Sequence, residues 1–184
     1  AECREVYLDF LSHLSERIDE MHAFPMTLTH NDFNYRNICL RDVSEQPRLV
    51  VYDWELACYQ NPQHDLIEFL VYALGDKTSK HTMDRYATYY LAILQEKTGL
   101  SFSAGAFHRV LYLNAVELGL VRFNVYLLTH NIVRFNFLDR VYGNLVNYIL
   151  AHHQGVETGT DHFPTTLKSK DHALSITRED RADV

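Results

Sequence analysis

Cysteine and basic charge are both scarce in this sequence. The three cysteines, Cys3, Cys39 and Cys58, form no CxxC pair and leave an odd one over. This argues against a disulfide scaffold, shows no zinc-ligand spacing and favours a reduced, cytoplasmic setting. Lysine and arginine number 17 against 24 acidic residues, and the net charge of −7 argues against nucleic acid as a partner.

A targeting segment and a long uncharged apolar run are missing as well. No charged segment followed by an apolar one opens the chain, so we predict no targeting signal. The most apolar long run, residues 111–129, contains Glu117 and Arg122, whose transfer into lipid costs several kcal/mol. We therefore expect a helix of a soluble protein and no membrane partner. The chain begins with Ala1 rather than Met, and we expect it to be a fragment of a longer protein.

The hydrophobic pattern predicts an α+β fold that is mainly α-helical. At 184 residues, with 47% hydrophobic and 22% charged residues, the chain suits one domain with a sizeable core. Apolar residues spaced three and four apart predict an amphipathic helix over residues 3–22, and a short extended entry follows at residues 26–29. Further helices are expected after residue 60, with Asn61 and Ser103 as caps, at residues 61–74, 82–97, 104–128 and 135–153.

The chain turns polar near its end. Glycine, threonine, aspartate and lysine are frequent over residues 155–184, and apolar residues are sparse. We therefore expect a domain over residues 1–154 and a mobile polar tail beyond it.

Residues 30–53 combine a polar loop with a predicted β-hairpin. The loop occupies residues 30–37, and apolar runs at 38–41 and 48–52 flank a turn rich in Asp, Ser, Glu and Pro. If Arg41 pairs with Arg48, Asn37 lies opposite Tyr52, one residue before Asp53. Two oxygen ligands then lie side by side at the mouth of the hairpin.

The polar residues of this stretch have the spacing of a phosphoryl-transfer site. H-x-D-x-x-x-x-N, followed by an Asp at the end of an apolar strand, is met by His30, Asp32, Asn37 and Asp53. The segment resembles the catalytic loop and metal-binding Asp of the protein-kinase-like superfamily. It is most similar to the small-molecule kinases, which include aminoglycoside phosphotransferases and choline or ethanolamine kinases. The features closest to that branch are His30-Asn31-Asp32, Asp53-Trp54-Glu55, Asn61-Pro62 and Asp65-Leu66.

The resemblance implies the C-terminal lobe of a kinase. It implies ATP-dependent transfer of the γ-phosphate to a hydroxyl of a small molecule, such as an aminoglycoside or an amino alcohol like choline. Asp32 would be the catalytic base, which is worth about 10²- to 10⁴-fold in rate. Asn37 and Asp53 would be ligands of Mg²⁺, which accepts both amide and carboxylate oxygens. His30 and Asp65 would brace the loop.

Two departures from the family pattern weaken the case for catalysis by this chain alone. All seven glycines lie after Asp53 and the first lysine is Lys77, so neither a glycine-containing phosphate loop nor a phosphate-binding lysine precedes His30. We therefore expect the N-terminal nucleotide-binding lobe to be absent from this chain, and to be supplied by the same protein or another chain. Asn34 stands where many protein kinases have lysine, and the nearest cation in sequence is Arg36. A non-catalytic, degenerate kinase-like binding module is the alternative.

Other interpretations of single residues remain open. Asp65 also suits a simple helix-start acid. A transition-metal site at His30, Asp32 and Asp53 lacks a fourth ligand, and His152-His153 needs no metal. Trp54 and the tyrosines suit either a quaternary ammonium or core packing. Three glutamates suit either a cationic substrate or a solvated or core-paired position: Glu55, Glu68 and Glu117.

Overall fold

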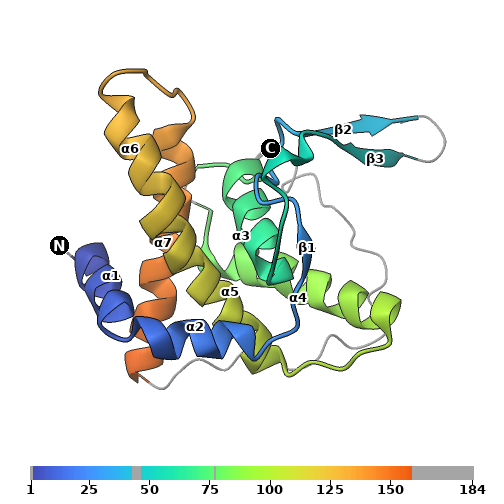
Figure 1. The fold of residues 1–184 in the computed structure, drawn as a ribbon, viewed down its shortest axis with the longest axis horizontal. Coiled ribbons are helices and arrows are strands. Elements are labelled where there is room, and N and C mark those ends of the chain that lie inside the picture. The colour runs from blue at the N-terminus through green and yellow to red at the C-terminus, as the bar shows by residue number, and fades with distance from the viewer. Residues whose placement is uncertain (1, 43–46, 77, 159–184) are drawn as a thin grey trace.

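Helices make up most of the described chain, and short antiparallel strand pairs accompany them (Figure 1). The structure is a computed structural model that describes residues 2–42, 47–76 and 78–158. Its elements are, in order, α1 Glu2–Ser12, α2 Leu14–His22, β1 Thr27–Thr29, β2 Ile38–Arg41, β3 Arg48–Val51, the 3₁₀ turn η1 Trp54–Leu56, β4 Cys58–Gln60, α3 Pro62–Ala73, α4 Lys80–Thr98, α5 Ala104–Leu118, the π-helical segment η2 Gly119–Phe123, α6 Asn124–His130 and α7 Leu138–Thr158.

Helix α3 is the centre of the core, as its nearly all-round apolar sequence predicts. Ile67 and Val71 are completely buried, and α3 packs against α5, α7 and β1. Asn61 occupies the N-cap position but makes no capping bond. Its side-chain amide instead donates to the carbonyl oxygens of Met21 and Phe24, at 3.0 and 3.3 Å. Asn61 therefore joins the end of α2 to the start of α3.

The predicted long helix after Ser103 is present, but a π-helical segment interrupts it. The Ser103 hydroxyl accepts the N–H of Ala106 at 3.3 Å, as expected of an N-cap. α5, η2 and α6 run without a break from Ala104 to His130. By length and composition this helix could cross a membrane, yet 56% of its most apolar window is buried inside the fold, which is also true of core helices. π segments are rare and often lie at functional sites.

The N-terminal segment differs from its prediction, because two helices replace one. The chain bends at His13, where φ is −115° and ψ is 27°. The side chains of Ser12 and His13 both bond to the Asp9 carbonyl oxygen, at 2.8 and 3.0 Å. Such local side-chain bonds compete with the helical pattern. The bend allows α1 to pack against α7 while α2 packs against α5.

The predicted hairpin has the predicted register. Arg41 pairs with Arg48 and Ile38 with Val51, and the Tyr52 N–H donates to the Asn37 carbonyl oxygen at 3.1 Å. The prediction of an irregular stretch up to residue 60 was wrong. Residues 58–60 form β4, which pairs antiparallel with β1. Three residues are too few for a recognisable alternation, but this pairing ties the entry of the polar loop to the start of α3.

The last helices also match the sequence closely. Helix α4 ends at Gly99, whose φ of 70° is the left-handed conformation expected at a helix end. Helix α7 begins later than predicted and continues to Thr158, so the first residues of the predicted polar tail are helical. The rest of that tail, residues 159–184, lies outside the described residues.

Gly119 opens the π segment in close contact with Tyr7 of α1. A Cβ atom at this position would lie 3.1 Å from Tyr7 Cζ, whereas a Cβ at Gly143 would meet nothing within 4 Å. We expect Gly119→Ala to lower the free energy of unfolding by about 1 to 3 kcal/mol through overpacking. Gly143→Ala, the matched control in α7, should leave it unchanged or raise it by up to about 1 kcal/mol. Urea denaturation of both variants tests this; equal effects would contradict the close Tyr7 contact.

Candidate functional site

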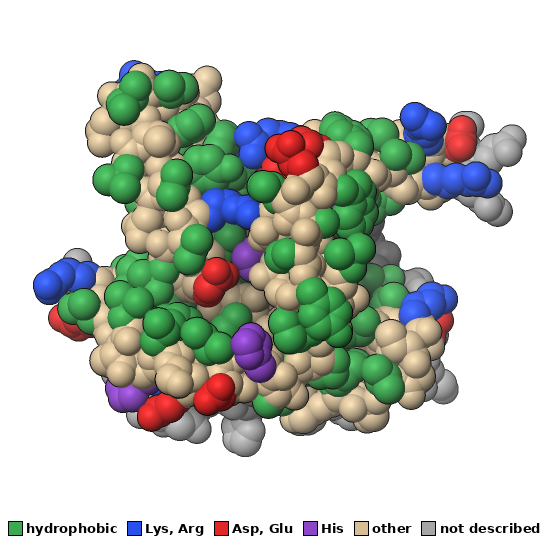
Figure 2. Space-filling view, in the orientation of Figure 1, with side chains coloured by type: hydrophobic (Ala, Val, Ile, Leu, Met, Phe, Trp, Pro, Cys, Tyr) green, Lys and Arg blue, Asp and Glu red, His purple; other side chains and the backbone are tan. Residues whose placement is uncertain are grey.

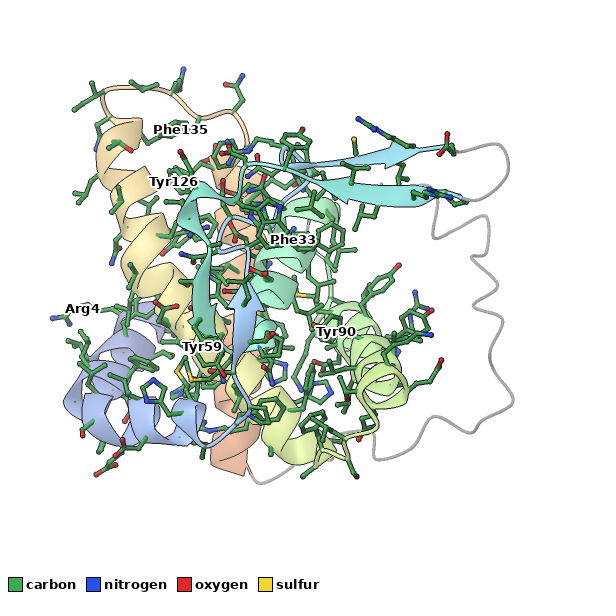
Figure 3. The ribbon with its side chains drawn as sticks, turned by 45° about the vertical axis from the view of Figure 1, so that its right-hand side comes forward. Arg4, Phe33, Tyr59, Tyr90, Tyr126 and Phe135 are labelled. Carbon is green, nitrogen blue, oxygen red and sulfur yellow. The ribbon has the colours of Figure 1, made fainter. Side chains whose placement is uncertain are left out.

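The polar loop, residues 30–37, lies where β1, the hairpin and the start of α3 meet. Figure 3 shows Phe33 of this loop with Tyr90 on the α4 side and Tyr126 on the α6 side. Figure 2 shows basic, acidic and histidine side chains gathered between the α6 side of the molecule and the β1–β4 side.

Asp65 holds the start of the loop from the first turn of α3. Its Oδ2 accepts the N–H of His30 at 2.6 Å, and its Oδ1 accepts the N–H of Asn31 at 2.9 Å. Both oxygens are therefore occupied by backbone donors that would otherwise lack partners. This geometry fits the bracing role that was predicted, and goes beyond that of a simple helix-start acid.

His30 connects the loop to the end of strand β3. The side chain is 1% exposed, and its Nε2 lies 2.8 Å from the Tyr52 carbonyl oxygen. A carbonyl can only accept, so Nε2 carries the proton. The ring packs against Trp54, with 4.8 Å between ring centroids. His30 therefore fixes the residue immediately before Asp53.

Asp32 is held by two asparagine amides. Its Oδ1 accepts from Asn34 Nδ2 at 3.0 Å, and its Oδ2 accepts from Asn37 Nδ2 at 2.7 Å. The Asn37 amide also donates to the Asp32 carbonyl oxygen at 2.9 Å. The carboxylate is thus fixed in orientation. Oδ1 also receives Arg122 Nη1 at 3.4 Å, so Oδ2 is the oxygen that keeps a lone pair for a further donor.

Asp53 has a strained backbone and an unengaged carboxylate. Its φ of 67° and ψ of 55° are left-handed, and Asn31 in the loop also has a positive φ, 56°. Left-handed non-glycine residues are uncommon and gather at functional sites. The Asp53 side chain is exposed and makes no hydrogen bond to the described residues. The bend at Asp53 thus presents a free carboxylate beside the mouth of the hairpin.

The oxygens of Asn37 and Asp53 suit magnesium. Asn37 uses its Nδ2 on Asp32, and its Oδ1 makes no hydrogen bond within the described part of the chain. The Tyr52 N–H donates to the Asn37 carbonyl oxygen, and Asp53 is the residue that follows Tyr52, so Asn37 and Asp53 adjoin the same end of the hairpin. Mg²⁺ commonly takes one or two protein oxygens and completes its shell with water and phosphate. For the alternative transition-metal site, residues 2–42, 47–76 and 78–158 contain no cluster of three or more His, Cys, Asp or Glu that could hold a metal.

Arg122 and Glu68 complete the support of the loop, and neither was predicted to do so. Glu68 is completely buried on α3, where its Oε2 accepts the N–H of Phe33 at 3.0 Å and its Oε1 accepts from Arg122 Nη1 at 2.6 Å. Arg122, from the π segment, also donates from Nη2 to the carbonyl oxygen and the Oδ1 of Asn31. Its Nη1 lies 3.4 Å from Asp32 Oδ1. The nearest cation to Asp32 in space is thus one that lies ninety residues away in sequence.

The environment moves the pKa of both members of this pair upward. Burial raises the pKa of Glu68, and the nearby Arg122 and His64 only partly offset this. Burial lowers the pKa of Arg122, but the Glu68 and Asp32 carboxylates outweigh it, so the pKa is raised overall. Arg122 therefore stays charged beside Asp32.

A signal for the pair was present in the sequence. Glu68 follows Asp65 by three residues, so both face the same side of an otherwise apolar helix. Arg122 is likewise charged within an apolar run. Charges in such positions are almost always paired, although which ones pair cannot be deduced from one sequence.

The other two glutamates and Trp54 have different surroundings. Glu117 Oε2 lies 3.4 Å from His64 Nδ1, at ion-pair distance but without hydrogen-bond geometry. Glu55 is exposed on the η1 turn. Trp54 is half-exposed, donates from Nε1 to the Val51 carbonyl oxygen at 3.2 Å, and packs on His30. Core pairing is therefore observed for Glu68 and, more loosely, for Glu117.

An apolar pocket of about 480 Å³ lies on the α4 side of the loop. Its lining comes from the loop, β3, α3 and α4, and includes Phe33, Leu49, Phe69 and Tyr90. Asp65 is its only charged lining residue, and both Asp65 oxygens are occupied by backbone N–H groups. The lining of this pocket therefore offers apolar contacts, whereas Asp32 and Arg122 are not among its lining residues.

Comparison with known proteins identifies the class. The family model APH, described as the Phosphotransferase enzyme family, matches residues 1–102. This is more than half of the chain, so the chain belongs to this family and the resemblance noted from residues 30–66 is confirmed. The curated proteins and the solved structures that were compared gave no match. The matched region includes every predicted site residue but ends before Arg122.

The Glu68–Arg122 pair can be tested through stability. We expect Arg122→Met to lower the free energy of unfolding by about 3 to 5 kcal/mol, because Glu68 remains buried without its cation. The double variant Glu68→Gln/Arg122→Met should recover much of this, since the glutamine oxygen still accepts the Phe33 N–H. If the loss of stability in the double variant equalled the sum of the losses in Glu68→Gln and Arg122→Met, the pairing would be contradicted.

The same variant has a predicted pH dependence. When burial raises the pKa of a carboxyl group, the folded state binds its proton more tightly than the unfolded state does. The free energy of unfolding is therefore highest below the unfolded pKa, and it falls as the pH rises toward the folded pKa. Removing Arg122 removes the main cation that lowers the pKa of Glu68. The stability gap between Arg122→Met and wild type should therefore widen as the pH rises from about 4.3 toward neutrality. A gap that narrows would show that Glu68 is not the group involved.

Proposed function

We propose that this chain is the substrate-binding, catalytic-loop lobe of an ATP- and Mg²⁺-dependent kinase that phosphorylates a hydroxyl of a small molecule. Membership of the family implies phosphotransferase chemistry in general. The proposal rests on one observation: Asp32 is fixed by Asn34 and Asn37, while within the described residues the Asn37 Oδ1 atom and the Asp53 carboxylate make no hydrogen bond. The loop and the end of the hairpin thus offer a proton acceptor and two oxygens suited to a metal.

In this mechanism Asp32 takes the proton of the attacking hydroxyl. The two asparagine amides hold its carboxylate in one orientation, so little conformational entropy is lost at this side chain when the acceptor binds. Arg122 places a positive charge next to Asp32, with Nη1 3.4 Å from Asp32 Oδ1, and helps to hold the carboxylate in position. General-base assistance of this kind is worth about 10²- to 10⁴-fold.

Asn37 and Asp53 would hold magnesium. An Mg²⁺ ion held by these two residues would supply positive charge to offset the charge that develops on the transferred phosphate. The left-handed backbone at Asp53 and the bond from the Tyr52 N–H to the Asn37 carbonyl oxygen support this proposal, because both proposed ligands adjoin the same end of the hairpin. His30 supports this by holding the Tyr52 carbonyl.

The remaining contacts to ATP would come from an N-terminal lobe of the same protein or of another chain. Residues that normally cradle the phosphates, a glycine loop and a lysine, do not precede residue 30 in the sequence given. We therefore propose that the hairpin and the polar loop form one wall of a two-lobed nucleotide site.

Substitution of the two aspartates tests the proposal. In the intact protein with Mg-ATP and an alcohol acceptor, we expect Asp32→Asn to lower kcat at least about a hundredfold, because the base is lost while the shape is kept. Asp53→Ala should also lower kcat severely. Asp19→Asn, at an exposed position on α2, is the matched control and should have no effect.

The outcome distinguishes enzyme from binding module. Unchanged turnover in Asp32→Asn, with circular dichroism showing a folded protein, would overturn the base assignment. An intact wild-type protein that transfers no γ-phosphate to alcohols or water would favour the non-catalytic, degenerate kinase-like module.

A further inference from the structure

Arg36 is a fixed guanidinium group that the proposed mechanism does not use. Its backbone N–H and its Nε both donate to Asn34 Oδ1, each at 3.1 Å. Its guanidinium carbon lies 5.0 Å from the ring centroid of Phe137 and 5.6 Å from that of Tyr72. One edge and the face of the guanidinium group are thus held by the protein.

The rest of the guanidinium group is exposed to solvent, and the Tyr126 side chain interacts with it. Burial lowers the pKa of Arg36, but Tyr72, Tyr126 and Asp32 outweigh it and raise the pKa overall. The group therefore presents N–H donors with a permanent charge at the surface, and a guanidinium group of this kind binds carboxylate and phosphate.

Arg36 and the proposed base are joined through a single side chain. The Asn34 amide donates from Nδ2 to Asp32 Oδ1 at 3.0 Å and accepts from Arg36 Nε through its Oδ1 at 3.1 Å. An anionic group on Arg36 and a hydroxyl on Asp32 therefore lie within the span of one small molecule.

A cationic acceptor is poorly matched to this part of the surface. Glu68 is paired with Arg122, and Asp65 is occupied by backbone N–H groups. Such an acceptor would also approach two arginines that interact with Asp32, Arg36 and Arg122. The repulsion disfavours a polyamine or a quaternary ammonium bound here.

We propose that the acceptor carries an anionic group, a carboxylate or a phosphate, which Arg36 binds while Asp32 receives the proton of the acceptor hydroxyl. The acceptor class is thus a short hydroxy acid or an alcohol phosphate rather than an aminoglycoside or amino alcohol. This assignment rests on the proposed kinase function. Arg36 is in this sense a specificity-determining residue of the same site.

The test compares four three-carbon alcohols that differ in charge: glycerate, glycerol phosphate, glycerol and aminopropanediol. Initial rates are measured with the intact protein and Mg-ATP. We expect at least one of the two anions to have a KM about tenfold or more below that of glycerol, and aminopropanediol to have the highest KM. Preference between the two anions identifies carboxylate or phosphate as the group recognised.

Three variants assign this preference to Arg36. Arg36→Gln should raise the KM for the preferred anion by about ten- to a hundredfold, leaving the KM for glycerol and for ATP unchanged. The KM of Arg36→Lys for the same anion should lie between those of wild type and Arg36→Gln, because lysine keeps the charge and loses the planar guanidinium donors. Arg134→Gln removes an exposed arginine elsewhere and should match wild type. A raised KM for ATP in Arg36→Gln, or the lowest KM for aminopropanediol, would overturn the proposal.

Binding measured without turnover separates this proposal from the kinase function itself. Calorimetric titration of the preferred anion should show about tenfold weaker binding to Arg36→Gln and wild-type affinity in Asp32→Asn. Equal affinity of Arg36→Gln and wild type would refute the anion site. If wild type transfers no phosphate yet binds glycerate or glycerol phosphate through Arg36, the anion site stands and the kinase function fails.

Discussion

The polar loop keeps its shape because one face of α3 accepts its backbone N–H groups. Asp65 takes the N–H groups of His30 and Asn31, and Glu68 takes that of Phe33. The loop satisfies the N–H groups of Asn34 and Asn37 internally, but those of His30, Asn31 and Phe33 would lack these partners without the two carboxylates. The position of Asp32 therefore depends on a helix that begins thirty residues later.

The carboxylates of Asp65 and Glu68 have different partners. Asp65 lies in the first turn of α3 and is partly exposed, and its two oxygens accept two backbone N–H groups. Glu68 is fully buried one turn on and needs a cation, which Arg122 provides from the π-helical segment. The extra residue per turn in a π segment changes the direction of the side chains that follow. The π segment that interrupts the long helix thus carries the arginine that supports the loop through Glu68.

Much of this arrangement could be predicted from the sequence, because it is local. The hairpin register follows from two apolar runs around a polar turn, and the loop residues are identified by their spacing. The pairing of β1 with β4 could not be predicted, because three residues show no period. Arg122 could not be assigned to the loop for a different reason. Its partners lie far away in the chain, and only the packing of α3 against α5 and of α5 into η2 brings them together.

Paramagnetic broadening by Mn²⁺ examines the metal and nucleotide site without relying on turnover. The intact protein, labelled with ¹⁵N, would be titrated with ATP and Mn²⁺ in place of Mg²⁺. If residues 30–53 form the phosphoryl-transfer centre, the amide signals of Asn37, Tyr52 and Asp53 broaden first and most strongly. Broadening centred on another part of the molecule, or none at saturating Mn-ATP, would contradict this assignment.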